Sequence, residues 1–279
     1  MAITVNTNVA SLTAQHSLNK ATTKMNTAME RMSIGLKINS SKDDAAGWAV
    51  SRKLDYKTSS LSVAQSNAQM GASMLDTMEG VMGVVNDNLN RIRDLTEQAA
   101  NGTYGSDAMK AMATEINSSL AELTRPAKST EFNGKNFING SITDPIQLQV
   151  GITGGTESQI TLEASLFQNC QAQAGLGLSD VSTSWSDTDA RTFLTSVDAA
   201  IASVTDATTA IGGKQAAITS AIDAANVMQT NLTSSSSLIK DADIAAESSN
   251  YIKQQILQQT SATLLATANQ SPSIALNLV

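Results

Sequence analysis

The longest regular pattern in the chain is an apolar stripe between residues 61 and 99, whose steps alternate between three and four residues. Its members are Leu61, Ala64, Ala68, Gly71, Leu75, Met78, Met82, Val85, Leu89, Ile92, Thr96 and Ala99. Apolar positions that repeat about every 3.5 residues form the seam along which long helices pack. Traced back through Leu54 and Val50, the stripe predicts one helix from about Ala45 to Ala100. Residues 61–99 alone would span roughly 60 Å at about 1.5 Å per residue, so the stripe can be buried only against other long helices.

Weaker or shorter stripes with the same spacing lie on both sides of this segment. Residues 11–36 carry a thin, alanine-rich one, formed by Ala14, Leu18, Ala21, Met25, Ala28 and Met32. After a turn at Asn101-Gly102, a third stripe consists of Met109, Met112, Ile116, Leu120 and Leu123. We expect that helix to end near Arg125 because Pro126 follows. The short connection predicts that it folds back antiparallel on the long helix.

The pattern changes in the middle of the chain. Asn133-Gly134 and Asn139-Gly140 are turn dipeptides. Apolar and polar residues alternate over residues 146–150 and 159–163, which predicts a small antiparallel β-hairpin. We expect residues 140–188 to form a short exposed region, in which residues 168–188, rich in Gly, Ser, Gln and Asp, are a loop or an exposed edge.

Helical spacing returns from Leu194 to Leu232, and the serines at residues 234–237 break it. A last amphipathic segment begins near Asp241 and is expected to stop at Pro272. Its apolar positions are Ile252, Ile256, Leu257, Leu264, Leu265 and Ala268. The stripes at the two ends have too little apolar area to be stable alone, so each needs a partner: the other end or a neighbouring copy of the molecule. The fold class is therefore mainly α, a long antiparallel helical bundle or coiled-coil rod with a small β-hairpin in the middle.

Composition and charge argue against several classes of function. The 279 residues include one His and one Cys, and only 3% are aromatic. The formal net charge is -7 without any basic run, which argues against binding nucleic acid. No stretch reaches the ~18 consecutive apolar residues of a membrane span. The start lacks the cationic and apolar regions of a cleaved signal peptide, which by default indicates the cytoplasm and otherwise export by a route that does not read such a signal.

No catalytic, cofactor or metal site is predicted. His16 has no Asp, Glu or Cys at ligand spacing, and one His in a weak terminal helix gives no Ser/His/Asp set. Met70, Met74, Met78 and Met82 follow helical spacing and indicate packing. The single Cys170 cannot form a disulfide within the chain. The chain is therefore not expected to be an enzyme.

Several segments are similar to one known family. They are Ile34-Gly-Leu-Lys-Ile-Asn-Ser-Ser-Lys-Asp-Asp-Ala-Ala-Gly47, Leu89-Asn-Arg-Ile-Arg-Asp-Leu-Thr-Glu-Gln-Ala-Ala100, Glu131-Phe-Asn-Gly-Lys135, and Gln254-Gln-Ile-Leu-Gln-Gln259 with Ala268-Asn-Gln270. They resemble bacterial flagellin, over both ends and most of the interior. The resemblance implies that the two termini pair in an inner core of residues 1–44 and 235–279. A helical rod with a β-hairpin would follow over residues 45–234, without the outer domains that many members carry.

The resemblance implies a structural subunit that self-assembles into the helical bacterial flagellar filament for motility. Such subunits are secreted by the flagellar type III route, join the extracellular filament under a cap protein, and have hook-junction proteins and an export chaperone as partners. The assembly helices would use Leu18, Met25, Met32, Ile252, Ile256, Leu257, Leu264 and Leu265. The chaperone would cover the C-terminal stripe around Ile252–Leu265. A hook–filament junction protein and a secreted coiled-coil adhesin remain as alternative functions.

The resemblance also implies recognition by a Toll-like flagellin receptor, through an Arg, a Leu and a Glu that match Arg91, Leu95 and Glu115. Arg91 and Leu95 are one helical turn apart and are expected to share a face. Alternatively, Arg91 and Glu115 are ordinary solvated residues, and Leu95 only flanks the seam.

Overall fold

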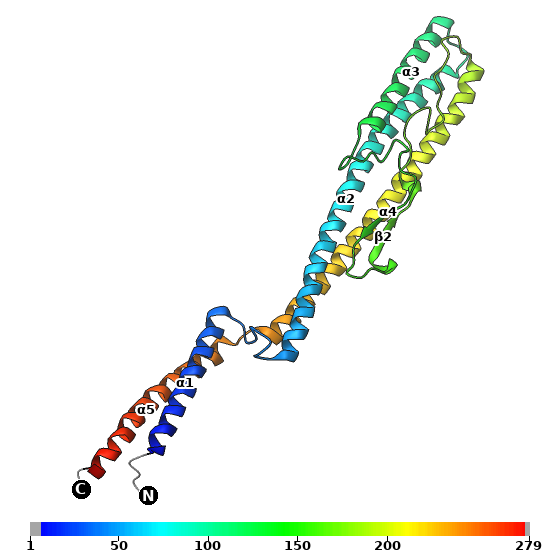
Figure 1. Ribbon diagram of the computed structural model, residues 1–279. Coiled ribbons are helices and arrows are strands. Elements are labelled where there is room, and N and C mark those ends of the chain that lie inside the picture. Colours follow the sequence, from blue (N-terminus) through cyan, green and yellow to red (C-terminus); the bar gives the residue numbers. More distant parts are fainter. Residues whose placement is uncertain (1–6, 277–279) are drawn as a thin grey trace. The chain divides into compact units, whose positions relative to one another are not determined.

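The computed structural model describes residues 7–276. The helices are α1 (Val9–Ile34), α2 (Ala45–Ala99), α3 (Ser106–Ser129), α4 (Asp187–Lys240) and α5 (Ile244–Leu276), and the strands are β1 (Ile146–Gln149) and β2 (Gln159–Leu162). Two short 3₁₀ turns, η1 (Thr156–Ser158) and η2 (Ala164–Leu166), flank β2 (Figure 1). The strands pair antiparallel, with Ile146 opposite Leu162 and Gln149 opposite Gln159. The predicted helical fold with a central hairpin is confirmed.

The chain divides into two compact units. The terminal unit comprises Met1–Thr58 and Thr230–Val279, and the central unit comprises Ser59–Gln229. Helices α2 and α4 contribute residues to both. The predicted domain boundaries, at 44/45 and 234/235, stay a prediction.

In the terminal unit, α1 lies antiparallel beside α5 (Figure 1). Hydrogen bonds fix their register: Asn8 Nδ2 donates to the Ala268 carbonyl at 2.7 Å, and Gln258 Nε2 donates to Thr22 Oγ1 at 3.1 Å. The same Asn8 caps α1 by accepting the backbone N–H of Ser11. The predicted pairing of the two ends is therefore present within one chain.

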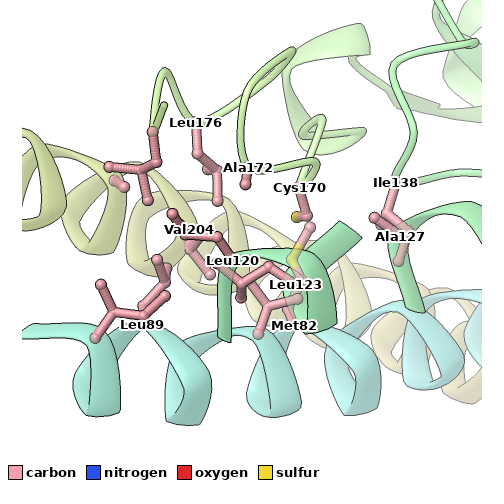
Figure 2. Close-up of a cluster of buried hydrophobic side chains, with 14 of the residues drawn as sticks. Met82, Leu89, Leu120, Leu123, Ala127, Ile138, Cys170, Ala172, Leu176 and Val204 are labelled. Carbon is pink, nitrogen blue, oxygen red and sulfur yellow. The ribbon is translucent and has the colours of Figure 1, made fainter. Parts of the chain in front are cut away.

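The central unit is built on the predicted α2 stripe. Its large side chains are completely or almost completely buried, as are those of the α3 stripe (Figure 2). The most enclosed are Leu75, Met78, Met82, Leu89, Ile92, Ile116, Leu120 and Leu123. Each full burial of such a side chain contributes about 1.5–3 kcal/mol relative to exposure.

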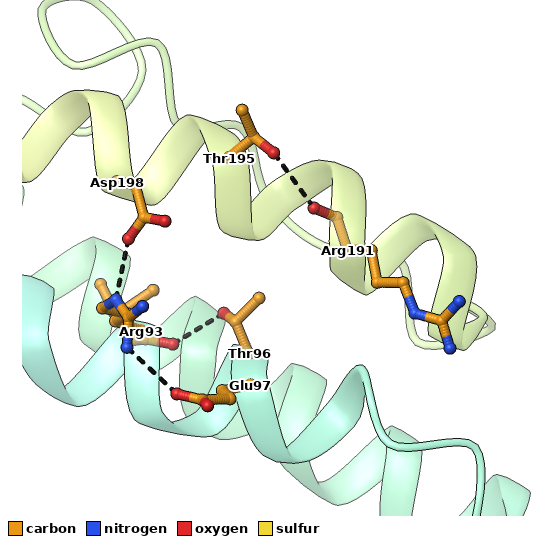
Figure 3. A network of polar contacts seen from close by, with 7 residues as sticks. Arg93, Thr96, Glu97, Arg191, Thr195 and Asp198 are labelled. Atoms are coloured by element: carbon orange, nitrogen blue, oxygen red, sulfur yellow. Dashed lines mark hydrogen bonds and ion pairs between the residues drawn. The ribbon is translucent and has the colours of Figure 1, made fainter.

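Polar contacts close one edge of this core between α2 and α4 (Figure 3). Arg93 Nε lies 2.8 Å from Asp198 Oδ1, and Arg93 Nη1 lies 3.0 Å from Glu97 Oε2. The Asp198 carboxylate, with a smaller contribution from Glu97, raises the pKa of Arg93. Thr96, the polar member of the stripe, is fully buried, but its hydroxyl donates to the Ile92 carbonyl at 2.7 Å, so the polar group costs little.

A glycine on α2 makes room for the hairpin. A Cβ built on Gly71 would collide with Leu148 Cδ1 of β1. Beside it, Asn67 Nδ2 donates to the Gln149 carbonyl at 3.2 Å. Leu148 of β1 therefore occupies the space at Gly71 that a side chain of α2 would otherwise fill.

The prediction that residues 140–188 form an exposed region is wrong for many of their apolar side chains. Those of residues 162–185 close over the α2–α3–α4 core and are buried: Leu162, Leu166, Phe167, Cys170, Ala172, Leu176, Leu178, Val181 and Trp185. The Asn117 side chain of α3 pairs with the backbone of this segment as a neighbouring strand would. Its Oδ1 accepts the Val181 N–H at 2.8 Å, and its Nδ2 donates to the Val181 carbonyl at 2.9 Å. Trp185 Nε1 donates to the Met109 carbonyl at 3.1 Å. The segment has little regular secondary structure, yet it completes the core.

Two of the predicted helix ends are wrong, and so is the expected break at the serines. Helix α3 continues through Pro126 to Ser129, where Asn136 Nδ2 donates to the carbonyls of Ala127 and Lys128. Helix α5 continues past Pro272 to Leu276, because a proline removes one intrahelical hydrogen bond rather than all of them. Helix α4 runs through the serines to Lys240, and the Ser235 hydroxyl there bonds the carbonyl one turn back.

Candidate functional site

Helix α5 has two different faces. The face toward α1 is a row of half-buried or buried residues with three-four spacing: Glu247, Tyr251, Gln254, Gln258, Ser261, Leu265 and Ala268. Most of these side chains are polar or small. Glu247 pairs with Arg31 of α1 at 3.1 Å, and Ser261 is buried. The contact between the two terminal helices is therefore made mostly by polar and small side chains rather than by large hydrophobic ones.

Four other large apolar side chains of α5 are exposed. Ile252, Ile256, Leu257 and Leu264 are 52%, 57%, 43% and 58% exposed. On α1 the buried residues are Ala21 and Ala28, while Leu18, Met25 and Met32 are half-buried. Of the predicted assembly residues, Leu18, Met25, Met32 and Leu265 thus contribute partly to the pair, and the other four face outward. Ile252 and Ile256 lie one turn apart, and Leu257 and Leu264 lie two turns apart on an adjoining face; we call these four exposed side chains the outward row. Exposed large apolar side chains that gather on a helix mark a surface that binds another molecule.

The chain segments that enter and leave this pair are held together. Lys37 N–H donates to the Lys240 carbonyl at 2.7 Å, and Ala242 N–H donates to the Gly35 carbonyl at 2.9 Å. Lys240 Nζ lies 3.1 Å from an oxygen of Asp55. These bonds join the segment that follows α1 to the segment that precedes α5, which places α1 and α5 side by side.

The central unit carries a surface with few charges. Residues 59–75 of α2 contain no Asp, Glu, Lys or Arg, and residues 215–229 of α4 contain only Asp223. We call these two segments the low-charge band; Gln65 Nε2 joins them by donating to Asn226 Oδ1 at 2.9 Å. By contrast, the remaining part of α2 in the central unit, residues 76–99, carries Asp76, Glu79, Asp87, Arg91, Arg93, Asp94 and Glu97.

Apolar side chains stand exposed in the low-charge band. Val63, Met70 and Val227 are 60%, 58% and 63% exposed. Met70 also borders an open groove of about 330 Å³, lined in addition by Phe132 and Leu148. Depletion of charge with retention of exposed apolar and methionine side chains is the composition of protein–protein interfaces.

The predicted receptor residues are brought together only in part. Arg91 and Glu115 form an exposed ion pair between α2 and α3, with Arg91 Nε 3.1 Å from Glu115 Oε1. Leu95 does not share their exposed face, because its side chain is 3% exposed and packs in the core. The α2 stripe widens here to include Leu95 beside Ile92, since α3 and α4 both contact this part of the helix.

Chemical sites are few in the described residues. Cys170 is enclosed by the core, and burial raises the pKa of its thiol to about 11, so it stays protonated and inert at neutral pH. Hydrogen bonds from the Ser40 hydroxyl and N–H lower the pKa of Asp43, which orders the turn before α2. Within residues 7–276 no three His, Cys, Asp or Glu side chains gather as a metal site. None of the helices described there has the length and hydropathy to cross a bilayer.

Two family models match this chain. Residues 5–143 match the family model of the bacterial flagellin N-terminal helical region, and residues 194–279 match that of the C-terminal helical region. The chain belongs to the bacterial flagellin family. The family that the sequence motifs predicted is therefore confirmed, and residues 144–193, which contain the hairpin and the segment packed over the core, lie between the two matches.

Individual relatives cover this family member from end to end. It is 33% identical to a flagellin of Serratia marcescens over 352 residues, with 100% of both chains covered. It is 31% identical to a flagellin of Listeria innocua over 284 residues, with 99% of each covered. Among solved structures, a putative flagellar hook-associated protein from Vibrio parahaemolyticus matches with a TM-score of 0.58 over 71% of this chain and 99% of that one. At 16% identity, that likeness concerns the fold alone.

Proposed function

We propose that this chain is a structural subunit that polymerises into the bacterial flagellar filament. The observation that carries the proposal is the outward apolar row of α5, formed by Ile252, Ile256, Leu257 and Leu264. This row finds no partner in the described part of its own chain, and in a monomer it would expose apolar area to water. Burial against other copies removes that cost, at about 25 cal/mol per Å² of apolar surface.

The weak pairing of α1 with α5 supports the same proposal. A pair that buries alanine and serine has little hydrophobic stabilisation of its own, so it can order when copies pack around it. Coupled ordering of this kind costs several kcal/mol, which a large helix interface offsets. The low-charge band of the central unit offers a further surface for neighbouring copies, because Asp223 is the one charged side chain there that would have to be desolvated.

The proposal extends to the route by which the subunit reaches the filament. The subunit would be secreted by the flagellar type III apparatus and added beneath a filament cap, on a filament joined to the hook by junction proteins. Before assembly, an export chaperone would cover the outward row around Ile252–Leu265, since the same apolar surface would otherwise bind other copies too early. The role is structural rather than catalytic.

The junction-protein and adhesin alternatives receive less support. The likeness to a hook-associated protein is a likeness of fold, whereas full-length relatives in two organisms are flagellins. A junction protein is present in few copies and does not form long polymers on its own.

Electron microscopy of the purified full-length protein at high concentration tests the proposal. We expect long filaments, because the polymer is open-ended. A chain lacking residues 244–279 should form none, while circular dichroism still shows the helices of the central unit. Short caps or no assembly by the full-length protein would favour the alternatives, and a truncated chain that loses the central helices as well would contradict the division of roles.

A further inference from the structure

Three Asn-Gly dipeptides occur in turns of the central unit, and their surroundings differ. They are Asn101-Gly102, Asn133-Gly134 and Asn139-Gly140. An asparagine followed by glycine is chemically labile, because the glycine nitrogen, unshielded by a Cβ, can reach the asparagine side-chain carbonyl carbon. The attack requires the side chain and the following peptide bond to rotate toward each other. Whatever holds these groups in place therefore protects the asparagine.

Asn139 is held on both sides. Its Oδ1 accepts the Ser141 N–H at 2.9 Å, and its backbone carbonyl accepts Gln171 Nε2 at 2.8 Å. Gly140 is closely packed as well, since a Cβ built on it would lie 2.8 Å from Asn169 Nδ2. Rotation of Asn139 would break both hydrogen bonds and push Gly140 into its neighbour.

Asn133 is fixed through its backbone. Phe132 and Lys135 exchange two hydrogen bonds, of 2.8 and 3.1 Å, across the two-residue turn that contains Asn133 and Gly134. Both turn residues have positive φ, 51° and 73°, as such a tight turn requires. Bringing the Gly134 nitrogen to the Asn133 side chain would open this turn.

Asn101 lies in the connection between α2 and α3, where residues 101–105 are all exposed. Within the described residues, neither its side chain nor the Gly102 N–H has a hydrogen-bond partner. The connection is loosely packed: a Cβ built on Gly102 would meet Asp187 Oδ2 at an ordinary 3.6 Å. The Asn101 N–H donates to the Gln98 carbonyl at 3.1 Å, but the bond from the Tyr104 N–H to the Asn101 carbonyl is long, at 3.5 Å.

We propose that Asn101 is a site of spontaneous deamidation. The Gly102 nitrogen attacks Asn101 Cγ, a new N–Cγ bond forms, and the bond from Cγ to the side-chain nitrogen breaks. The Gly102 proton leaves with that nitrogen as ammonia, and a succinimide ring remains. Water then opens the ring at either carbonyl, which gives aspartate or, with the main chain passing through Cβ, isoaspartate. No electrons are transferred, and water is the sole co-reactant.

The product changes the charge of the connection. A carboxylate then stands just beyond the C-terminal end of α2, where the helix dipole disfavours negative charge. The Asp187 carboxylate lies near Gly102, while Arg191, 3.0 Å from Asp187 and 3.3 Å from the Ala100 carbonyl, is the nearby cation. An older population of molecules would therefore include a second, more acidic form, with an added carboxylate in the connection between α2 and α3.

Peptide mapping by mass spectrometry measures all three sites in one sample of the full-length protein. The protein is incubated at mildly alkaline pH, and an isoaspartate-specific methyltransferase labels the rearranged product. We expect conversion at Asn101 to be several-fold faster than at Asn133 or Asn139. Gly102→Ala should suppress conversion at Asn101 and leave the other two rates unchanged.

The same incubation in denaturant provides the control. There the three dipeptides lose their different surroundings, and their rates should converge. Equal rates at the three sites in the folded protein would overturn the proposal, as would faster conversion at Asn133 or Asn139. The proposal would also be overturned if folding slowed the conversion at Asn101 as much as it slows the conversion at Asn139.

Discussion

The terminal and central units use the same helical spacing with side chains of different size. In the central unit, the stripe of α2 buries Leu75, Met82 and Leu89 completely. In the terminal unit, the contact between α1 and α5 buries Ala21, Ala28 and Ser261, and most of the large apolar side chains of α5 stay exposed. Spacing sets which residues share a face, but the size of those residues sets how much stabilisation the contact provides.

The difference supports the proposal that the central unit is stable by itself and that the chain ends order on assembly. The central unit has its own core, closed by the segment that Asn117 and Trp185 hold in place. The terminal unit has a register, fixed by bonds such as Arg31–Glu247, but little buried apolar area. A helix pair with a fixed register but little core is suited to the proposed ordering on assembly, in which other copies would supply the missing stabilisation.

The largest expected effect is on assembly, through the outward row of α5. Ile252→Glu combined with Ile256→Glu should prevent polymerisation or raise the critical concentration by more than about tenfold, equivalent to about 1.4 kcal/mol. Both side chains are more than half exposed in the monomer. The charges therefore cost little until a neighbouring copy removes them from water. Sedimentation of filaments over a range of protein concentrations measures the change.

Gln259→Glu is the matched control for this pair. It adds negative charge to an exposed position of the same helix without removing an apolar side chain. We expect its critical concentration to stay close to that of the parent. If Gln259→Glu impaired assembly as strongly as the isoleucine variant, charge on α5 rather than the apolar row would be responsible.

The second effect is on folding and separates the two cores. Leu120→Ala in the central unit should reduce the free energy of unfolding by about 2–5 kcal/mol, because the side chain is 2% exposed and leaves a cavity. Met25→Ala in the half-buried α1 seam removes a side chain of similar size and should cost clearly less. Chemical denaturation followed by circular dichroism measures both. Equal losses would mean that the terminal pair has a core comparable to that of the central unit.

The sequence predicts the central stripe better than the terminal one. The α2 stripe from Leu61 to Ala99 is buried throughout, because its apolar residues meet other helices of the same chain. On α5 the apolar residues Ile252 and Ile256 are also correctly placed on one face. The spacing cannot tell whether that face packs on α1 or on another molecule, because the same sequence pattern is expected in either case.

The segment over the core was not predictable from spacing for a different reason. Its buried residues, among them Leu178 and Val181, follow neither a helical nor a strand period. They are placed by side-chain bonds to backbone groups, such as those of Asn117, which involve residues far apart in the sequence. Leu95 illustrates the same limit, since the neighbours that bury it come from α3 and α4.

A third, smaller effect compares two glycines of α2. Gly80→Ala meets no atom within 4 Å and should stabilise the central unit by about 0.5–1 kcal/mol, because alanine favours the helix. Gly71→Ala has the same helical benefit but collides with Leu148, so it should lose that gain and destabilise by about 1–3 kcal/mol. Thermal unfolding measures the difference between the two variants, and hydrogen exchange in the hairpin identifies its source. Two equally stabilised variants would show that Leu148 adjusts at no cost and that Gly71 is not needed to seat β1.

The smallest expected effect on stability concerns Arg91, where a binding role and a structural one are separable. Its ion pair with Glu115 joins two half-exposed side chains, so Arg91→Ala should change the free energy of unfolding by less than about 1 kcal/mol. If Arg91 and Glu115 contact a Toll-like receptor, signalling by the monomer should fall for Arg91→Ala while unfolding stays almost unchanged. Arg125→Ala, which removes an exposed arginine paired with Glu122 on α3, is the matched control and should signal like the parent. An unstimulating parent, or equal losses in both variants, would contradict the receptor role. Because Leu95 is buried, any binding here has to use the polar pair rather than the apolar side chain one turn further along α2.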